Sequence, residues 1–183
     1  MARTNQILQN PVTGQTIRFV QTARETGGRL LEMEALLRPH SSEPAAHFHP
    51  QQDEDFVVLS GELTVWLNGQ LQTLQAGERL HVPRNTVHSM WNDSESETVV
   101  NWQVRPALDT EQLFETMVGL VNDRKVNAKG QPSLLQAVLL AGHFRNVYRL
   151  ANPSQRIQTV IFWLLTPIAL LVGYRPIYVK YLR

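Results

Sequence analysis

The feature that most constrains the fold is a change in hydrophobic period near Pro106. Before it, short runs such as residues 31–37 alternate apolar and polar side chains, and turn signals such as the Asn-Gly pair at 68–69 separate them. This pattern is typical of half-buried strands joined by tight hairpins. After Pro106, apolar residues recur every three or four positions, as they do in helices. We therefore predict a mainly β protein, with a β-barrel over residues 1–108 and an α-helical C-terminal extension over residues 109–183.

Capping residues indicate where the helices of the extension begin. Asp109 predicts the start of a first helix, in which apolar residues recur from 113 to 120. Ser133 precedes a predicted second helix over residues 134 to about 148. A third predicted helix covers residues 155 to about 172.

The composition is that of a folded protein without cysteine chemistry. Of 183 residues, 43% are hydrophobic and 18% are charged, which suits a globular domain. The absence of cysteine excludes disulfides, thiolate metal ligands and cysteine nucleophiles. No apolar run follows Arg3, so we expect no secretory signal peptide and a cytoplasmic location.

Charge is divided unevenly along the chain. Residues 124–183 contain nine bases and no acid, whereas residues 1–123 contain 8 bases and 16 acids, a net charge of −8. This asymmetry indicates an anionic partner for the extension, for example a membrane surface or the acidic first part of the chain itself. The bases are spread over helices with apolar faces, and no DNA-binding motif spacing is present, so nucleic-acid binding is not expected.

Three histidines and a glutamate form the candidate functional site. His47 and His49 point to the same side of a predicted strand, because alternate side chains of a strand share a face. Glu54 follows shortly after them, and His88 comes after a further hairpin. Imidazole nitrogens with one carboxylate oxygen suit a divalent transition metal, and the spacing does not distinguish iron, manganese, nickel, cobalt, copper and zinc. A lone His-x-His pair is more often two surface histidines, so the prediction depends on Glu54 and His88.

The other histidines and the neighbouring acids are expected to lie outside this site. Asp53 and Asp55 flank the glutamate but face the other way, so we expect both to be solvated. His81 lies on the outer face of its strand, and His40 and His143 are expected in a loop and on a helix surface. Three tryptophans are assigned to the core or the flank of the barrel: Trp66, Trp91 and Trp102.

Two segments, residues 47–61 (HFHPQQDEDFVVLSG) and residues 77–92 (GERLHVPRNTVHSMWN), resemble the two signature motifs of the cupin superfamily. The positions that fit are His47, His49, Glu54 and Gly61 in the first segment and Gly77, Pro83, His88 and Asn92 in the second. Asn85 replaces the second glycine of the second motif, and asparagine tolerates positive φ well enough for the turn to form. Ser41 stands where a glycine often precedes the first histidine. The resemblance covers about residues 29–104 and leaves the helical extension outside.

The resemblance implies a double-stranded β-helix, or jelly-roll, barrel with one divalent metal ion held by His47, His49, Glu54 and His88. It also implies a dioxygenase-like enzyme acting on a small molecule, with Glu54 as ligand and, by partial dissociation, as catalytic base. Redox-neutral isomerase or cyclase chemistry would use the same ligands. The alternative is a non-catalytic ligand-binding or sensor module whose extension docks to a membrane surface or partner. We further expect a homo-oligomer, most simply a homodimer.

Residues 157–174 form the most apolar stretch of the extension. As a helix they reach about 27 Å, which is marginal against the roughly 30 Å hydrocarbon core of a bilayer. Three interpretations remain open: a helix buried against the barrel or a partner subunit, an interfacial membrane anchor, and a true membrane span. We prefer the buried helix and place peripheral membrane contact through this segment second.

Overall fold

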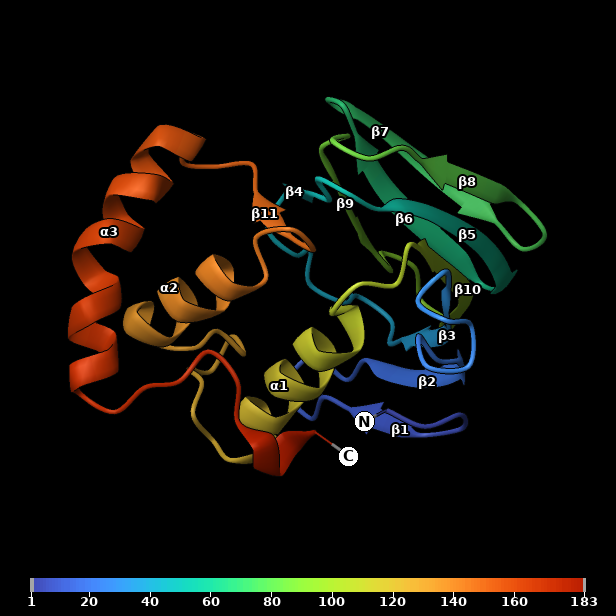
Figure 1. Ribbon diagram of the computed structural model, residues 1–183. Coiled ribbons are helices and arrows are strands. Elements are labelled where there is room, and N and C mark those ends of the chain that lie inside the picture. Colours follow the sequence, from blue (N-terminus) through green and yellow to red (C-terminus); the bar gives the residue numbers. More distant parts are fainter. Residues whose placement is uncertain (1, 183) are drawn as a thin grey trace.

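The computed structural model describes residues 2–182 as two antiparallel β-sheets beside a group of helices (Figure 1). In spatial order, the six-stranded sheet contains β1 (Ile7–Gln9), β2 (Thr16–Gln21), β3 (Leu31–Leu37), β10 (Thr98–Arg105), β5 (Asp53–Ser60) and β8 (Arg79–Val82). The five-stranded sheet contains β11 (Arg149–Leu150), β4 (His47–Phe48), β9 (His88–Trp91), β6 (Glu62–Leu67) and β7 (Gln70–Gln75). The helices are α1 (Thr110–Asn122), α2 (Leu134–His143) and α3 (Gln155–Leu171), followed by the short 3₁₀ helix η1 (Val179–Tyr181). The double-stranded β-helix barrel with a helical C-terminal extension is thus confirmed.

Alternating side chains fill the space between the two sheets. In β3, Leu31, Met33 and Ala35 are buried while the glutamates between them are only half-buried, as predicted. β10 lies between β3 and β5 and pairs with both, so the inward faces of these three strands form one wall. A second cluster, centred on Phe56 and Val65, joins this wall to the five-stranded sheet. Burial of this apolar surface is the main favourable contribution to folding.

The tight turns predicted for the barrel are present. Asn68 and Gly69 have φ values of 48° and 87°, as a two-residue hairpin of the primed type between β6 and β7 requires. Asn85 has a φ of 64°, so asparagine does adopt the left-handed conformation at the position where the cupin motif has glycine.

The first helix is confirmed and covers one side of the barrel. α1 begins directly after Asp109, although the Asp109 side chain makes no capping hydrogen bond. Phe114 and Val118 pack against the barrel cluster that contains Phe19 and Met33. The first helix of the extension therefore shares a core with the strands.

The predicted second helix is too long. α2 ends at His143, five residues before the predicted end at 148. The chain leaves the helix because Arg149 and Leu150 form β11, which pairs with Phe48 and His47 of β4. The predicted last turn of the helix is therefore absent, and the backbone of β11 bonds instead to β4 at the edge of the five-stranded sheet.

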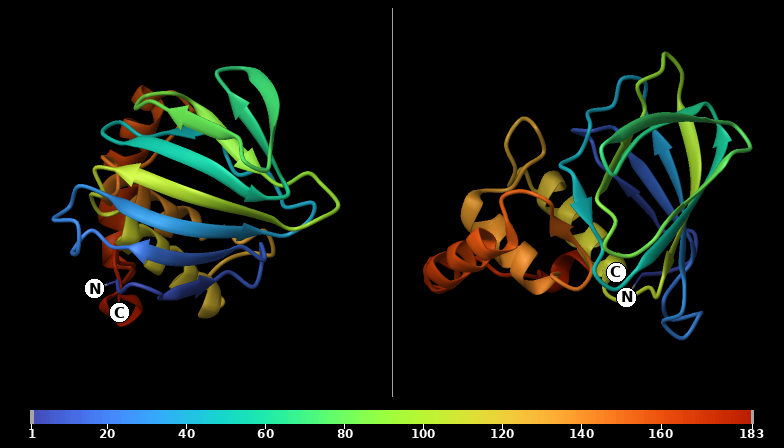
Figure 2. Two further views of the ribbon diagram at one scale, coloured as in Figure 1. Left: turned by 90° about the vertical axis from the view of Figure 1, so that its right-hand side faces the viewer. Right: turned by 90° about the horizontal axis from the view of Figure 1, so that it is seen from above.

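The third helix has the predicted extent but not the preferred environment. α3 packs against α2, on the side of the molecule away from the barrel (Figures 1 and 2). Of its residues only Gln158 and Ala169 are buried. The helix is not buried against the barrel, because α2 lies between them, and its burial against a partner subunit stays a prediction. No helix in the described part of the chain is long and apolar enough to cross a membrane.

Gly61 offers a test of the barrel's closest backbone approach. Gly61 has a φ of 76°, and a Cβ there would lie 2.5 Å from the carbonyl oxygen of Glu97. Gly69 has a similar φ of 87° with open space around it. We expect Gly69→Ala to lower the free energy of unfolding by about 1 kcal/mol through backbone strain alone. Gly61→Ala should lower it by a further 1–3 kcal/mol or so, because overpacking against backbone adds to the strain. Urea unfolding measures both; equal losses would contradict the close approach.

Candidate metal site

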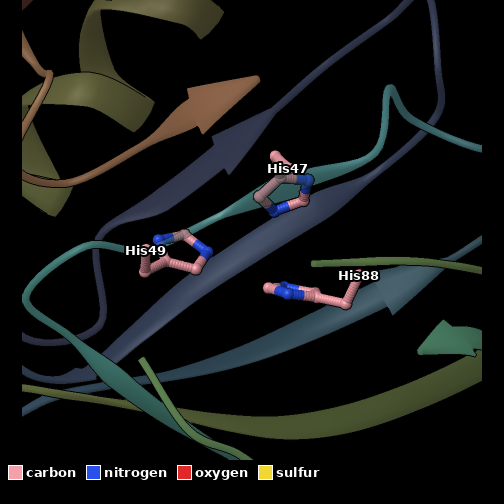
Figure 3. A group of neighbouring side chains, drawn as sticks. All are labelled: His47, His49 and His88. Atoms are coloured by element: carbon pink, nitrogen blue, oxygen red, sulfur yellow. The ribbon is translucent and has the colours of Figure 1, made fainter. Parts of the chain in front are cut away.

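The three candidate histidines come together at one end of the barrel cavity. His47 on β4 and His88 on β9 are directly opposed in neighbouring antiparallel strands. His49 follows β4 immediately, and its ring points toward the space between the other two (Figure 3). One nitrogen of each ring lies within 4.8 Å of the others. Strand register and the two-residue alternation of β4 therefore bring the three imidazoles together.

Backbone carbonyl groups fix the orientation of all three rings. The Nδ1–H groups donate to Ala45 (3.0 Å from His47), Val147 (2.5 Å from His49) and Thr86 (3.0 Å from His88). Because a carbonyl oxygen can only accept, each Nδ1 carries the proton and each Nε2 has its lone pair free when the ring is neutral. A metal-binding histidine typically donates its other ring N–H in this way.

Glu54 on β5 joins two of these histidines. Its Oε2 lies 3.2 Å from His49 Nε2 and 3.1 Å from His88 Nε2, and its Oε1 accepts a hydrogen bond from Trp102 Nε1 at 3.0 Å. The Glu54 side chain is only 1% exposed. Despite the short distances, His49 Nε2 and Glu54 Oε2 are buried without a hydrogen-bond partner in the described part of the chain.

These orphaned atoms fit a metal ion. Two neighbouring ligands of an octahedral ion with bonds of about 2.1 Å are about 3.0 Å apart, close to the separations of Glu54 Oε2 from the two imidazole nitrogens. A buried carboxylate with no donor directed at one oxygen is costly unless a cation compensates it. The three imidazole nitrogens lie within 4.8 Å of one another and form a candidate metal site. Glu54, the fourth predicted ligand, lies beside His49 and His88 but is not part of this three-histidine group.

Burial and neighbouring charge keep His47 neutral and Glu54 ionised, as metal binding requires, whereas the charge of Glu54 favours a proton on His49 that a bound metal ion would have to displace. Burial, helped by the nearby His88 and His49, lowers the pKa of His47 to about 3, so this ring is neutral at physiological pH. Burial alone would raise the pKa of Glu54, but His49 and His88 lower it below its usual value and the group is a carboxylate. Burial would lower the pKa of His49, and the carboxylate of Glu54 raises it instead.

The site opens onto a cavity of about 390 Å³ whose walls are mainly apolar. Phe56, Met90 and Trp102 line it from the barrel, and Phe114 and Met117 line it from α1. The volume is within the range of small-molecule sites, which are mostly apolar with a few polar groups.

The extension also supplies part of the site, which the sequence did not reveal. The carbonyl of Val147 orients His49, and the Tyr148 ring lies against His47 with centroids 4.7 Å apart. Burial raises the pKa of Tyr148 to about 12, so it remains a neutral phenol. No local pattern around Tyr148 signals a binding site. Trp102, assigned only to core or flank, did carry a signal, since an indole N–H on an inward strand face needs an acceptor.

The remaining candidates lie where the sequence placed them, outside the cavity. His81 is exposed and contacts Asp55, and His40 contacts Glu95 in a loop. His143 is exposed at the end of α2. Asp53 faces outward but is paired with Arg84 rather than simply solvated.

The chain is thus a double-stranded β-helix barrel in which three histidines converge on the cavity and form a candidate metal centre. Residues 33–104 match the family model Cupin_2, described as a cupin domain.

A curated relative and two solved structures match part of the chain. Over 84 residues the chain is 36% identical to quercetin 2,3-dioxygenase of Bacillus subtilis. The match covers 45% of this chain and 25% of that protein, so the chain spans about a quarter of the length of this relative. KdgF from Halomonas sp. has a TM-score of 0.49 and 19% identity, with 58% of this chain and 92% of that chain covered. An RmlC-like cupin from Shewanella frigidimarina has a TM-score of 0.49 and 18% identity, with 58% and 88% covered.

Substitution of the candidate ligands should weaken metal binding strongly without unfolding the barrel. We expect His49→Ala and Glu54→Gln to weaken affinity by more than the roughly 10–100-fold that loss of a supporting residue costs. Elemental analysis after purification and metal titration measure the effect. His81→Ala is the matched control, because this exposed histidine pairs with Asp55 outside the cavity. Retained metal in both ligand variants would contradict the assignment.

Trp102→Phe isolates the hydrogen bond to Glu54. Phenylalanine keeps a ring that can stack on Phe56, whose centroid is 5.5 Å from that of Trp102, but it lacks the N–H. We expect about tenfold weaker metal binding with little change in unfolding midpoint, since the carboxylate loses its orienting partner. An unchanged affinity would mean that the indole does not position Glu54.

Proposed function

We propose that this protein is a metal-dependent enzyme that acts on small, largely apolar molecules, with dioxygenase chemistry as the reaction. The observation that carries the proposal is the convergence of three imidazole nitrogens, with the buried carboxylate of Glu54 beside two of them, on a mainly apolar cavity. Ligands held on strands or directly after one, with fixed tautomers, are preorganised for a metal.

One divalent transition metal ion, of iron, manganese, nickel, cobalt, copper or zinc, would be held by His47, His49, His88 and Glu54. Bound there it would supply Lewis acidity and, if it is a redox metal, a means of using dioxygen. The donor set suits any of these ions.

The chain's own residues perform the remaining tasks. Phe56, Met90 and Phe114 provide apolar walls that exclude water and hold an aromatic or enolic substrate. Glu54 would accept the proton of a substrate hydroxyl by partial dissociation of its Oε2 from the ion, while Trp102 donates to Oε1 and holds the carboxylate in place. General base catalysis of this kind typically contributes about 10²–10⁴ in rate.

The redox balance of the proposed reaction needs no further co-reactant. A dioxygenase places both atoms of dioxygen in its product, so the substrate itself is oxidised and supplies the four electrons that reduce dioxygen. The name of the Bacillus subtilis relative, quercetin 2,3-dioxygenase, supports this class of reaction. The substrate of the present chain is proposed only as an aromatic or enolic molecule bearing a hydroxyl group.

Oxygen uptake tests the proposal directly. Protein loaded anaerobically with each redox-active metal in turn should consume dioxygen with at least one member of a panel of hydroxylated aromatic and enolic compounds that includes quercetin. Glu54→Gln, compared at equal bound metal, should lower the rate by about 10²–10⁴, whereas His81→Ala should not change it. The proposal fails if no redox metal supports uptake across the panel. Anaerobic turnover would identify isomerase or cyclase chemistry instead, and tight binding without turnover would identify a ligand-binding module.

A further inference from the structure

The two faces of α3 differ in what they contact. Gln158, Phe162, Leu165 and Ala169 follow one another at helical spacing and are buried or half-buried toward α2. The opposite face, which we call the α3 apolar face, consists of Ile157, Val160, Trp163, Leu164, Ile168 and Leu171. Trp163 is 77% exposed and Leu171 is 87% exposed. Both faces are thus apolar, and only one has a partner in the described part of the chain.

An exposed patch of this kind requires an explanation. Single exposed apolar residues are normal on a protein surface, but a contiguous apolar face marks an interaction site. In the barrel, the large exposed apolar residues are scattered over separate elements, among them Ile7 on β1, Leu59 on β5 and Leu71 on β7. The α3 apolar face is therefore distinct from the rest of the described surface.

The charges around this face indicate an anionic partner. Arg156 is exposed and falls on the same helical stripe as Val160 and Trp163. Arg175 is exposed just beyond the other end, where its guanidinium donates to the carbonyl groups of Leu170 and Tyr174. No acidic residue occurs after Asp123 in the sequence. An apolar helix face with cations at both ends matches the acyl and headgroup layers of an anionic membrane surface.

A second copy of the chain fits the same face less well. Two α3 helices packed antiparallel would place Arg156 of one copy near Arg175 of the other, and a parallel pair would place like arginines together. The extension offers no carboxylate beyond Asp123 to compensate either arrangement. The barrel of a second copy carries acids but no contiguous apolar face among its described residues.

We propose that the α3 apolar face docks the protein on the surface of a phospholipid bilayer that contains anionic lipid. α3 lies in the plane of the interface, with Trp163 and Leu171 inserted at the acyl boundary and Arg156 and Arg175 near the headgroups. This orientation agrees with a helix of 17 residues, about 26 Å, that does not meet the requirements of a span. The proposal is independent of the reaction proposed for the cavity.

Vesicle co-sedimentation of the full chain tests the proposal. The probes are vesicles of phosphatidylcholine alone and vesicles of phosphatidylcholine with phosphatidylglycerol. We expect binding to the anionic vesicles, weakened by added salt, with a blue shift of tryptophan emission that Trp163→Phe removes. The double variant Trp163→Gln/Leu171→Gln should bind at least about tenfold more weakly, since it removes two exposed apolar anchors.

A charge variant and a matched control separate the contributions. Arg156→Gln/Arg175→Gln keeps the apolar face and should weaken binding by about fivefold per arginine. Leu71→Gln changes an apolar residue that is 67% exposed on β7 and should bind as the unaltered protein does. Circular dichroism confirms that each variant is folded.

Two results would overturn the proposal. Absence of binding to the anionic vesicles, with a dimer in sedimentation equilibrium that Trp163→Gln/Leu171→Gln dissociates, would make the α3 apolar face the interface of a homodimer. Equal loss of vesicle binding in Leu71→Gln would show that the contact is not made by this face.

Discussion

The structure of the site depends on one repeated interaction, the hydrogen bond from each histidine Nδ1–H to a backbone carbonyl. Three such bonds, to Ala45, Thr86 and Val147, decide which nitrogen of each ring faces the cavity. Strand pairing alone would bring the rings together but would leave their tautomers and rotations open. Because the acceptors are main-chain atoms of the barrel and its extension, the chemistry of the site is tied to the fold itself.

The sequence was sufficient for the features that local patterns determine. Alternation identified β3 and its neighbours, and the left-handed preference of asparagine correctly anticipated the turn at Asn85. The motif spacing predicted a site of His47, His49, His88 and Glu54. The structure groups the three histidines and places Glu54 beside two of them. These inferences succeed because strand periodicity and turn geometry act over a few residues.

What the sequence could not supply comes from contacts between distant segments. The end of α2 at His143 follows from the pairing of β11 with β4, a partner about a hundred residues earlier that no local pattern reveals. Tyr148 reaches His47 only through that pairing. The environment of α3 was also misjudged, because an apolar helix has the same pattern whether its faces meet protein or remain exposed. Tertiary contacts, rather than propensity, decided each of these cases.

The bond from His49 to Val147 links the extension thermodynamically to the cation site. Val147 belongs to the small core of the extension with Leu120, Leu140 and Phe144, so the carbonyl is in place only when that core is formed. Any ion that prefers the oriented imidazole must then favour the folded extension, and by reciprocity a perturbation that loosens the extension must lower affinity for the ion. Binding of the ion in the barrel and folding of the helical extension are therefore thermodynamically coupled.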